Sequence, residues 1–136
     1  YIFTIILGKN APHIQMIKEI IFNYKFIKLR VQPINIQSII LKADLAIGAP
    51  GISQIERMYL GVPSILIPQN KIQEPLILYW KKHKLALDSK DNINCVVDKI
   101  LKTSDKELST IKQNCLRLID SSGAKRVANL IKKYVT

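Results

Sequence analysis

Residues 43–68 read ADLAIGAPGISQIERMYLGVPSILIP, and this stretch decides the fold. Its two apolar runs, DLAIGA and SILIP, are each short enough for one buried strand, and ISQIERMYL between them has apolar residues at helical spacing. Gly61 stands where that helix is expected to end. A strand, a helix and a second strand in this order predict two parallel strands of one sheet.

The same alternation continues on both sides of this stretch. Short strands that are apolar along almost their whole length are typical of a parallel sheet that is covered on both faces. The sequence therefore predicts an α/β fold, namely a Rossmann-like three-layer domain with a parallel sheet of about five strands and a helical C-terminal tail. The tail is expected from residue 92 to residue 134, with breaks near Ser104 and at 121–123. The other expected strands are 1–7, 26–32 and 85–88, and the other expected helices are 12–24, 34–43 and 74–84.

Simple features of the sequence predict one domain of a longer polypeptide, without a membrane span or a metal site. The chain has 136 residues, which is enough for one domain with a hydrophobic core. It begins at Tyr1 inside an apolar run, so we expect a C-terminal fragment of a longer polypeptide. No apolar run reaches the ~18 residues of a membrane span. Cys95 and Cys115 lie far apart without metal-ligand spacing, so we expect no metal site and two free thiols in a reducing cytoplasm.

The net charge of +11 favours anionic partners, which include nucleic acid, an acidic membrane surface and phosphorylated small molecules. Most of the basic residues are lysines on expected helix faces, where lysines usually solvate a surface. Trp80 lies in the basic run WKKHK, a composition also found where aromatic rings stack on nucleic-acid bases. We expect Trp80 to pack in the protein instead, and we expect no nucleic-acid partner. A nucleic-acid-binding domain is the weakest alternative, because it rests on charge alone.

The turn between the two apolar runs of residues 43–68 is the candidate functional site. In open parallel sheets, ligands bind beyond the carboxyl ends of the strands, where Gly51 and the start of the next helix are expected. The backbone amides of residues 52–54 would be free at that helix start and would attract an anion such as a diphosphate. Ser53 adds a hydroxyl donor. Glu56, one turn further, can accept hydrogen bonds from the two hydroxyl groups of a ribose.

Ser53 and Glu56 also have a structural interpretation. Ser-x-x-Glu is the pattern of a capping box, in which the serine side chain caps the helix and the glutamate side chain bonds back to the serine amide. The residues alone leave both interpretations open.

Four stretches of the chain resemble the carboxyl-terminal half of GT-B-type nucleotide-sugar enzymes, above all the UDP-sugar hydrolase of pseudaminic acid biosynthesis and its spore-coat polysaccharide relatives. Residues 43–68 resemble the family's strand, glycine loop, helix with glutamate, small turn and strand. IQEP (72–75) resembles an asparagine-glutamine segment, and DSSGAKRV (120–127) resembles a closing Asp-Gly-x-Gly-Ala-x-Arg-Val. LGKNAP (7–12) lies where the family has a phosphate-side loop.

The resemblance implies a single nucleotide-sugar-binding domain, residues 1–136, that holds the UDP part of a UDP-sugar. In it, Glu56 matches the ribose-binding glutamate and Gln73 matches a glutamine that faces the ligand cleft. Two residues differ from the family's pattern, since Pro50 replaces a small residue and Ile72 replaces an asparagine. The implied nucleotide-binding residues are Gly8, Lys9, Asn10, Gly51, Ile52, Ser53, Glu56 and Gln73.

By the same resemblance, the function is that of the UDP-binding half of a nucleotide-sugar hydrolase in bacterial surface-sugar (nonulosonate) biosynthesis, which uses water. The family's catalytic histidine belongs to the N-terminal domain, so this chain would supply no catalytic residue and would need that domain as its partner. No cofactor is implied. Two alternatives remain: the C-terminal half of a glycosyltransferase with an alcohol acceptor, and a non-catalytic module appended to a sialic-acid-type cytidylyltransferase.

Overall fold

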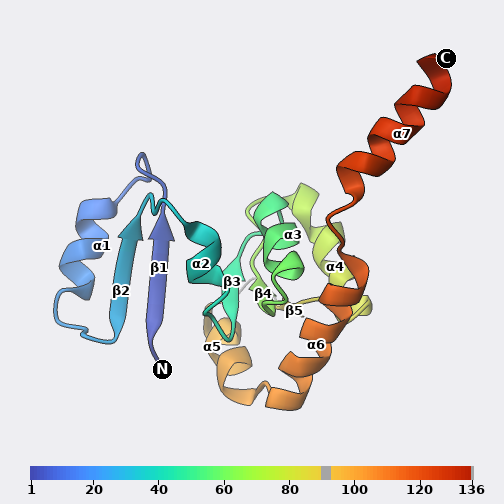
Figure 1. Ribbon diagram of the computed structural model, residues 1–136. Coiled ribbons are helices and arrows are strands. Elements are labelled where there is room, and N and C mark those ends of the chain that lie inside the picture. The colour runs from blue at the N-terminus through green and yellow to red at the C-terminus, as the bar shows by residue number, and fades with distance from the viewer. Residues whose placement is uncertain (90–92, 136) are drawn as a thin grey trace. The chain divides into compact units, whose positions relative to one another are not determined.

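The first of two compact units comprises residues Tyr1–Ile36. The structure is a computed structural model that describes residues 1–89 and 93–135 (Figure 1). In the first unit, β1 (Phe3–Leu7) and β2 (Ile27–Val31) pair in parallel along their whole length. The helix α1 (Ile14–Ile21) connects these strands and contacts β2, as a parallel pair requires. None of residues 1–36 is buried, so every apolar side chain of this unit stays partly accessible to solvent.

The second unit comprises residues Gln37–Thr136 and contains a three-stranded parallel sheet with the order β3-β4-β5. Ala46 of β3 lies opposite Ser64 of β4, and Ile65 of β4 lies opposite Leu87 of β5. The central strand β4 is therefore paired on both sides. The strands are β3 (Ala46–Gly48), β4 (Ser64–Leu66) and β5 (Leu87–Asp88), and the helical elements are α2 (Ile36–Ile40), α3 (Ile52–Tyr59), the 3₁₀ turn η1 (Lys71–Gln73), α4 (Glu74–Lys82), α5 (Ile93–Lys102), α6 (Asp105–Leu118) and α7 (Gly123–Val135).

The hydrophobic core of the second unit surrounds β4. Ile65 of β4, Met58 of α3 and Cys115 of α6 belong to one buried cluster, and α3 contacts α6. Because burying one such aliphatic side chain stabilises the fold by about 1.5–3 kcal/mol, this cluster holds α3 firmly on the sheet. Its buried members are Met58, Ile65, Leu85, Leu87, Val96, Ile111 and Cys115.

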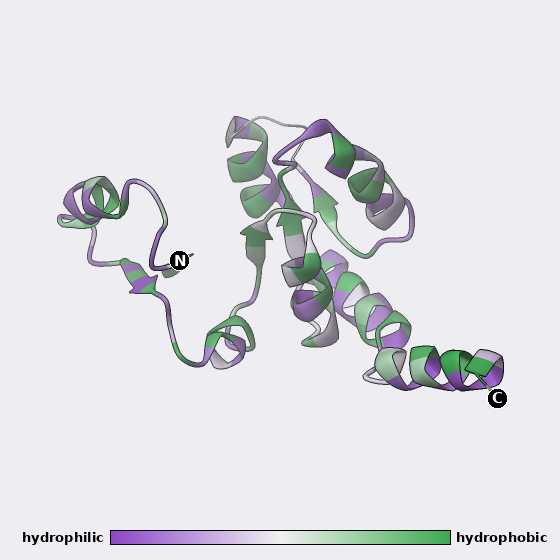
Figure 2. Ribbon diagram, turned by 90° about the horizontal axis from the view of Figure 1, so that it is seen from above, coloured by the Kyte–Doolittle hydropathy of each residue, from purple (hydrophilic) through white to green (hydrophobic). Residues whose placement is uncertain are grey.

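The last helix, α7, carries apolar residues that are exposed. Hydrophobic and hydrophilic residues are interleaved along its turns (Figure 2). Val127, Leu130, Ile131 and Tyr134 recur at intervals of three and four residues, which is the spacing of one apolar stripe on a helix. This stripe distinguishes α7 from α6, whose Ile111 and Cys115 are buried.

The predicted α/β class, the parallel pairing and the helical C-terminal tail are confirmed. The prediction of one sheet of about five strands is wrong. Over residues 1–89 and 93–135, β1 and β2 form one sheet, and β3, β4 and β5 form another. The apolar runs identified the strands correctly, but which strands pair depends on contacts between distant residues, and periodicity does not report them. None of the helices in the described ranges is long and apolar enough to cross a membrane.

Helix ends follow local backbone chemistry. The helix predicted for residues 12–24 is shorter than expected, because His13 adopts a left-handed conformation (φ 68°) and α1 begins after it. The predicted end of α3 is confirmed at Gly61, whose φ of 67° suits a residue without a side chain. The predicted breaks are confirmed, since Ser104 caps α6 and a turn precedes α7. Residue 92, the expected start of the tail, lies outside the described residues.

Candidate functional site

The glycine corner, defined as residues 48–53, connects the end of β3 to the start of α3. Gly51 is the N-cap of α3 and has an extended backbone. The amide of Gln54 donates to the carbonyl oxygen of Gly51 at 2.9 Å, which closes the first turn. Among the described residues, the amides of Ile52 and Ser53 have no such acceptor. Free donors of this kind, at the positive end of a helix dipole, form a favourable environment for an anion.

The surface of the glycine corner is open. Gly51, Ile52, Ser53 and Glu56 are all exposed, and a Cβ built on Gly51 would have no neighbouring atom within 4 Å. The four residues come from one short segment of β3–α3, so the sequence placed them together correctly. Ser53 and Glu56 are three residues apart and therefore lie on neighbouring positions of the same helix surface.

The capping-box interpretation of Ser53 and Glu56 is wrong. Gly51 is the N-cap of α3, and Ser53 is the second residue inside the helix, two positions after the one that a capping side chain would occupy. Within the described part of the chain, neither side chain has a hydrogen-bond partner, so both are available to a ligand. By contrast, Ser104 is a true N-cap, because its hydroxyl accepts a hydrogen bond from the amide of Glu107 at 3.2 Å.

A buried arginine, Arg57, which the sequence analysis did not identify, is hydrogen-bonded to the backbone of the glycine corner. The Nη2 atom of Arg57 donates to the carbonyl oxygen of Ala49 at 3.0 Å. Its Nε atom donates to Oε1 of Gln54 at 2.9 Å and to Oγ of Ser64 at 3.1 Å. Arg57 is 8% exposed, and Gln54 and Ser64 are fully buried. Arg57 thus connects α3 to both the corner and β4.

Burial lowers the pKa of Arg57, and the nearby Glu56 carboxylate raises it in part. The guanidinium group keeps its charge at neutral pH, because its ordinary pKa lies far above 7. Gly48 makes room for it, since a Cβ at that position would lie 3.0 Å from Nη1 of Arg57. One sequence signal was available, namely the spacing of Gln54 and Arg57, which places their side chains next to each other on a helix.

Gln73 lies in the segment that follows β4. The strand β4 pairs with β3, and β3 leads to the glycine corner. Parallel strands β3 and β4 pair directly, so the loops after them leave the sheet at the same edge. The Oε1 atom of Gln73 accepts a hydrogen bond from the amide of Gln69 at 2.8 Å, and its amide donates to Oδ1 of Asn70 at 3.2 Å. Gln73 therefore holds its own loop together, and Ile72 beside it is exposed.

Gly8, Lys9 and Asn10 lie in the loop after β1 of the first unit. All three are exposed, and the amide of Ala11 donates to the carbonyl oxygen of Gly8 at 3.1 Å. A Cβ on Gly8 would have no neighbour within 4 Å. Their role as a phosphate-side loop stays a prediction.

Each of the two units has a cavity of its own. A cavity of about 400 Å³ in the second unit is lined by four lysines together with Asp88 and Glu107. A cavity of about 310 Å³ lies beside α1 in the first unit. None of the predicted nucleotide-binding residues lines either cavity. The four lysines are Lys81, Lys84, Lys99 and Lys106.

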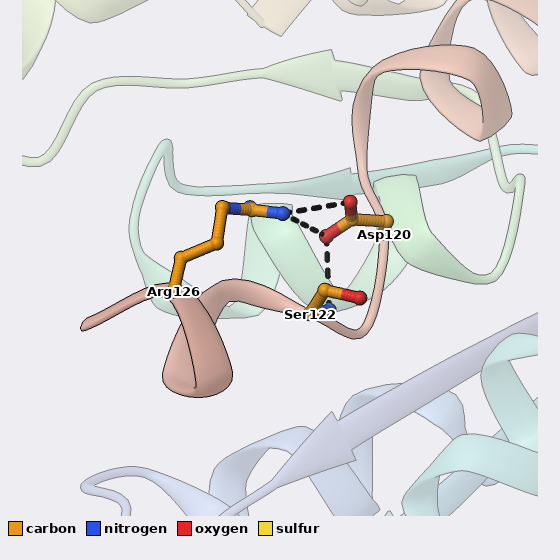
Figure 3. A network of polar contacts seen from close by, with 3 residues as sticks. All are labelled: Asp120, Ser122 and Arg126. Carbon is orange, nitrogen blue, oxygen red and sulfur yellow. Dashed lines mark hydrogen bonds and ion pairs between the residues drawn. The ribbon is translucent and has the colours of Figure 1, made fainter. Parts of the chain in front are cut away.

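Asp120 and Arg126 form an exposed ion pair between α6 and α7 (Figure 3). Nη1 of Arg126 donates to both carboxylate oxygens of Asp120, at 2.9 and 2.8 Å. The amide of Ser122 donates to the same carboxylate at 2.9 Å. The hydrogen bond from Arg126, followed by that from Ser122, lowers the pKa of Asp120. The pair orients the turn before α7, and because it is exposed it adds little to stability.

Groups of histidine, cysteine, aspartate or glutamate that could hold a metal ion are absent from the described residues. Cys95 and Cys115 are free, and Cys115 is buried and donates to the carbonyl oxygen of Leu85 at 3.2 Å. In the described part of the chain, the amides of Ile52 and Ser53 and the exposed side chains of Ser53 and Glu56 have no hydrogen-bond partner. This arrangement suits recognition of a phosphate group and of neighbouring hydroxyls.

Comparisons with known proteins bear on the fold. No protein-family model matches the chain, and no curated protein matches it. Among solved structures, the crystal structure of the glycotransferase of kitacinnamycin is similar, with a TM-score of 0.55 and 15% sequence identity. The match covers 96% of this chain and 42% of that chain, so this chain spans less than half the length of that protein. At this identity the likeness concerns the fold alone, and it supports a GT-B-like fold.

Proposed function

We propose that this chain is the nucleotide-sugar-binding half of a glycosyltransferase and that the glycine corner binds the diphosphate of the donor. One arrangement carries this proposal: an open helix N-terminus with free amides, next to an exposed glutamate, at the carboxyl edge of a parallel sheet. The fold adds support, because the similar solved structure is that of a glycotransferase. The resemblance of residues 43–68 to GT-B-type nucleotide-sugar enzymes supports the same site.

In the proposed complex, each group of the site has one task. The amides of Ile52 and Ser53 and the hydroxyl of Ser53 donate hydrogen bonds to diphosphate oxygens. Gly51 lets the ligand approach the backbone, since a side chain there would project into open space. Glu56 accepts hydrogen bonds from the two ribose hydroxyls. These contacts hold the nucleoside diphosphate as it becomes the leaving group, and the positive helix end stabilises the charge that develops on it.

In this proposal, residues outside this chain bind the acceptor substrate and supply the catalytic base. In glycosyl transfer, the bond from the anomeric carbon to the diphosphate breaks, an acceptor oxygen forms the new bond, and a base takes the acceptor's proton. With an alcohol as acceptor the enzyme is a transferase, and with water it is a hydrolase. We favour the transferase because the similar solved structure is a glycotransferase. The match covers 42% of the length of that protein.

The finer predictions rest on the resemblance of the sequence to UDP-sugar hydrolases. They are uridine as the base, water as the acceptor, nonulosonate biosynthesis as the pathway and an N-terminal domain as the partner. The exposed apolar stripe of α7 is a surface that such a domain would cover. The cytoplasm is the expected compartment, since nucleotide sugars are used there and both cysteines are free.

Calorimetric titration of the chain with UDP, CMP and a short oligonucleotide tests the function. We expect UDP to bind and the oligonucleotide not to bind. Glu56→Ala should weaken UDP binding about tenfold, which corresponds to about 1.4 kcal/mol for two lost ribose hydrogen bonds. Glu19→Ala is the matched control, because it removes an exposed carboxylate from the first unit. Oligonucleotide binding without UDP binding would reject the proposal in favour of a nucleic-acid-binding domain.

A further inference from the structure

Arg57 is a buried cation whose partners are all neutral. Its three hydrogen-bond acceptors are a backbone carbonyl, a glutamine amide and a serine hydroxyl. Among the described residues, no carboxylate forms an ion pair with it. Buried charges are usually paired, because moving a charge out of water is costly unless an opposite charge lies near. Arg57 therefore carries a buried positive charge next to the glycine corner that no ion pair in the described part of the chain neutralises and that the nearby Glu56 carboxylate offsets only in part.

The polar cluster around Arg57 contains a second unsatisfied group. Gln54 is fully buried, and its Nε2 atom has no hydrogen-bond partner in the described structure, while its Oε1 atom accepts from Arg57. An unpaired buried donor costs about 1–3 kcal/mol. A buried cation and an unsatisfied donor on the same helix turn both favour an electron-rich acceptor nearby, and the hydrogen bond to Ala49 connects Arg57 to the glycine corner.

We propose that Arg57 is a positioning residue for diphosphate recognition at the glycine corner. This inference rests on the proposed function of that site. By binding the carbonyl oxygen of Ala49, Arg57 holds the backbone that leads to Gly51 and so sets the direction of the free amides. Its charge acts on the bound anion through a protein interior of low dielectric constant, where charges interact more strongly than in water.

The ligand preference follows from the charge. A doubly phosphorylated nucleotide carries more negative charge than a monophosphate, so it gains more from a fixed cation at the same place. Arg57 is therefore expected to increase the preference of the site for UDP over UMP. A residue that only stabilised the fold would change the affinity for both ligands by the same factor.

Two substitutions separate the charge of Arg57 from its geometry. Arg57→Met removes both the charge and the three hydrogen bonds, and Arg57→Lys keeps the charge on a group that cannot reproduce the planar geometry. Gly48→Ala is a third, gentler change. It leaves Arg57 in the chain but places a methyl group 3.0 Å from Nη1, so the guanidinium group must shift. The control is Arg117→Met, which removes an exposed arginine from α6.

The experiment measures the Kd of UDP and of UMP for each variant by amide-shift titration below its melting temperature. For Arg57→Met we expect UDP binding to weaken about tenfold and UMP binding about threefold, so the UDP/UMP preference falls about threefold. Arg57→Lys should recover part of that preference, and Gly48→Ala should weaken UDP binding about threefold. Arg117→Met should change neither Kd by more than about twofold.

Each outcome either supports or overturns the positioning role of Arg57. If Arg57→Met folds and its UDP/UMP preference equals that of the wild type, Arg57 has only a structural role and the proposal is overturned. If Arg57→Met does not fold, Gly48→Ala decides instead, and an unchanged UDP Kd overturns the proposal. A wild-type chain that binds none of UDP, ADP, CDP and GDP would refute the proposed function itself, which is a different result from loss of the Arg57 effect.

Discussion

Two loops of this chain contain an exposed glycine and follow a parallel strand, and they are supported very differently. The loop after β1, residues 8–12, belongs to a unit without buried residues and is closed by a backbone hydrogen bond. In the glycine corner after β3, the carbonyl oxygen of Ala49 accepts a hydrogen bond from Arg57, and Pro50 is fully buried. Both loops resemble phosphate-binding segments in sequence, but the corner alone is anchored to a hydrophobic core.

The difference concerns preorganisation. A loop that is already fixed loses less conformational entropy when a ligand binds, so more of the contact energy appears as affinity. We therefore expect the glycine corner to contribute more to diphosphate binding than the loop of residues 8–12. The same contrast applies to stability, because the second unit contains the buried cluster around Ile65 and the first unit has no buried residue.

The largest predicted effect concerns the core of the second unit. Ile65→Ala should lower the free energy of unfolding by about 2–5 kcal/mol, because it leaves a cavity beside fully packed neighbours. Ile20→Ala in the first unit should change it by less than about 0.5 kcal/mol, because Ile20 is 58% exposed. Urea unfolding monitored by circular dichroism measures both. Equal losses would contradict the absence of buried side chains from residues 1–36.

Valine substitutions at the two glycines test the contrast between the loops directly. Gly51→Val should weaken UDP binding about tenfold, because its side chain would occupy the space proposed for the diphosphate. Gly8→Val should change the UDP Kd by less than about twofold, because that loop is less fixed. A Cβ at either position would have no neighbouring atom within 4 Å, so we expect the fold to tolerate both. A larger effect at Gly8 would reverse the assignment of the main phosphate site.

Two serines near helix starts provide a smaller test. Ser104→Ala should lower the free energy of unfolding by about 1 kcal/mol, because Ser104 caps α6. Ser53→Ala should change it by less than about 0.3 kcal/mol, because Gly51 is the cap of α3 and Ser53 is exposed. Thermal and urea unfolding measure both variants. A loss at Ser53 as large as that at Ser104 would restore the capping-box interpretation.

The smallest effect is the pH dependence due to the buried thiol of Cys115. Burial raises its pKa to about 11 from an ordinary value of 9.0. The folded state thus holds the proton that the unfolded state releases, so this contribution to stability is complete below pH 9 and is lost as the pH rises toward 11. At pH 9.5 the wild type should have lost about 0.8 kcal/mol relative to pH 7.

Cys115→Ala is the control for this pH dependence, because it lacks the thiol but keeps the other titrating groups. The wild type should lose more stability between pH 7 and 9.5 than Cys115→Ala does. Parallel pH profiles of unfolding for the two proteins would contradict a raised thiol pKa.

The sequence predicted the elements of the glycine corner because their signals are local. Gly51 interrupts the apolar run, the spacing of ISQIERMYL marks a helix, and Gly61 marks its end. The same local signals located every strand, yet they did not reveal that the strands divide between two sheets. Strand pairing depends on residues far apart in the chain, and a single sequence does not report those contacts.

The spacing of Gln54 and Arg57 places their side chains together, but the sequence does not show that Arg57 is buried beneath the site. A charged residue on a helix is usually exposed, and its burial follows from contacts with Ser64 on β4 and Ala49 in the corner. The exclusion of the capping box likewise required the backbone of Gly51, because Ser-x-x-Glu fits both a cap and a ligand site. The ligand-binding roles of Gly8, Lys9, Asn10 and Gln73 stay predictions.

Amide chemical-shift mapping of the chain during titration with UDP tests the central claim most directly. The account predicts that the largest shift changes occur at Gly51, Ile52 and Ser53, with smaller changes at Glu56. Changes concentrated on the lysine-lined cavity of the second unit, or changes absent from the glycine corner at saturating UDP, would contradict it.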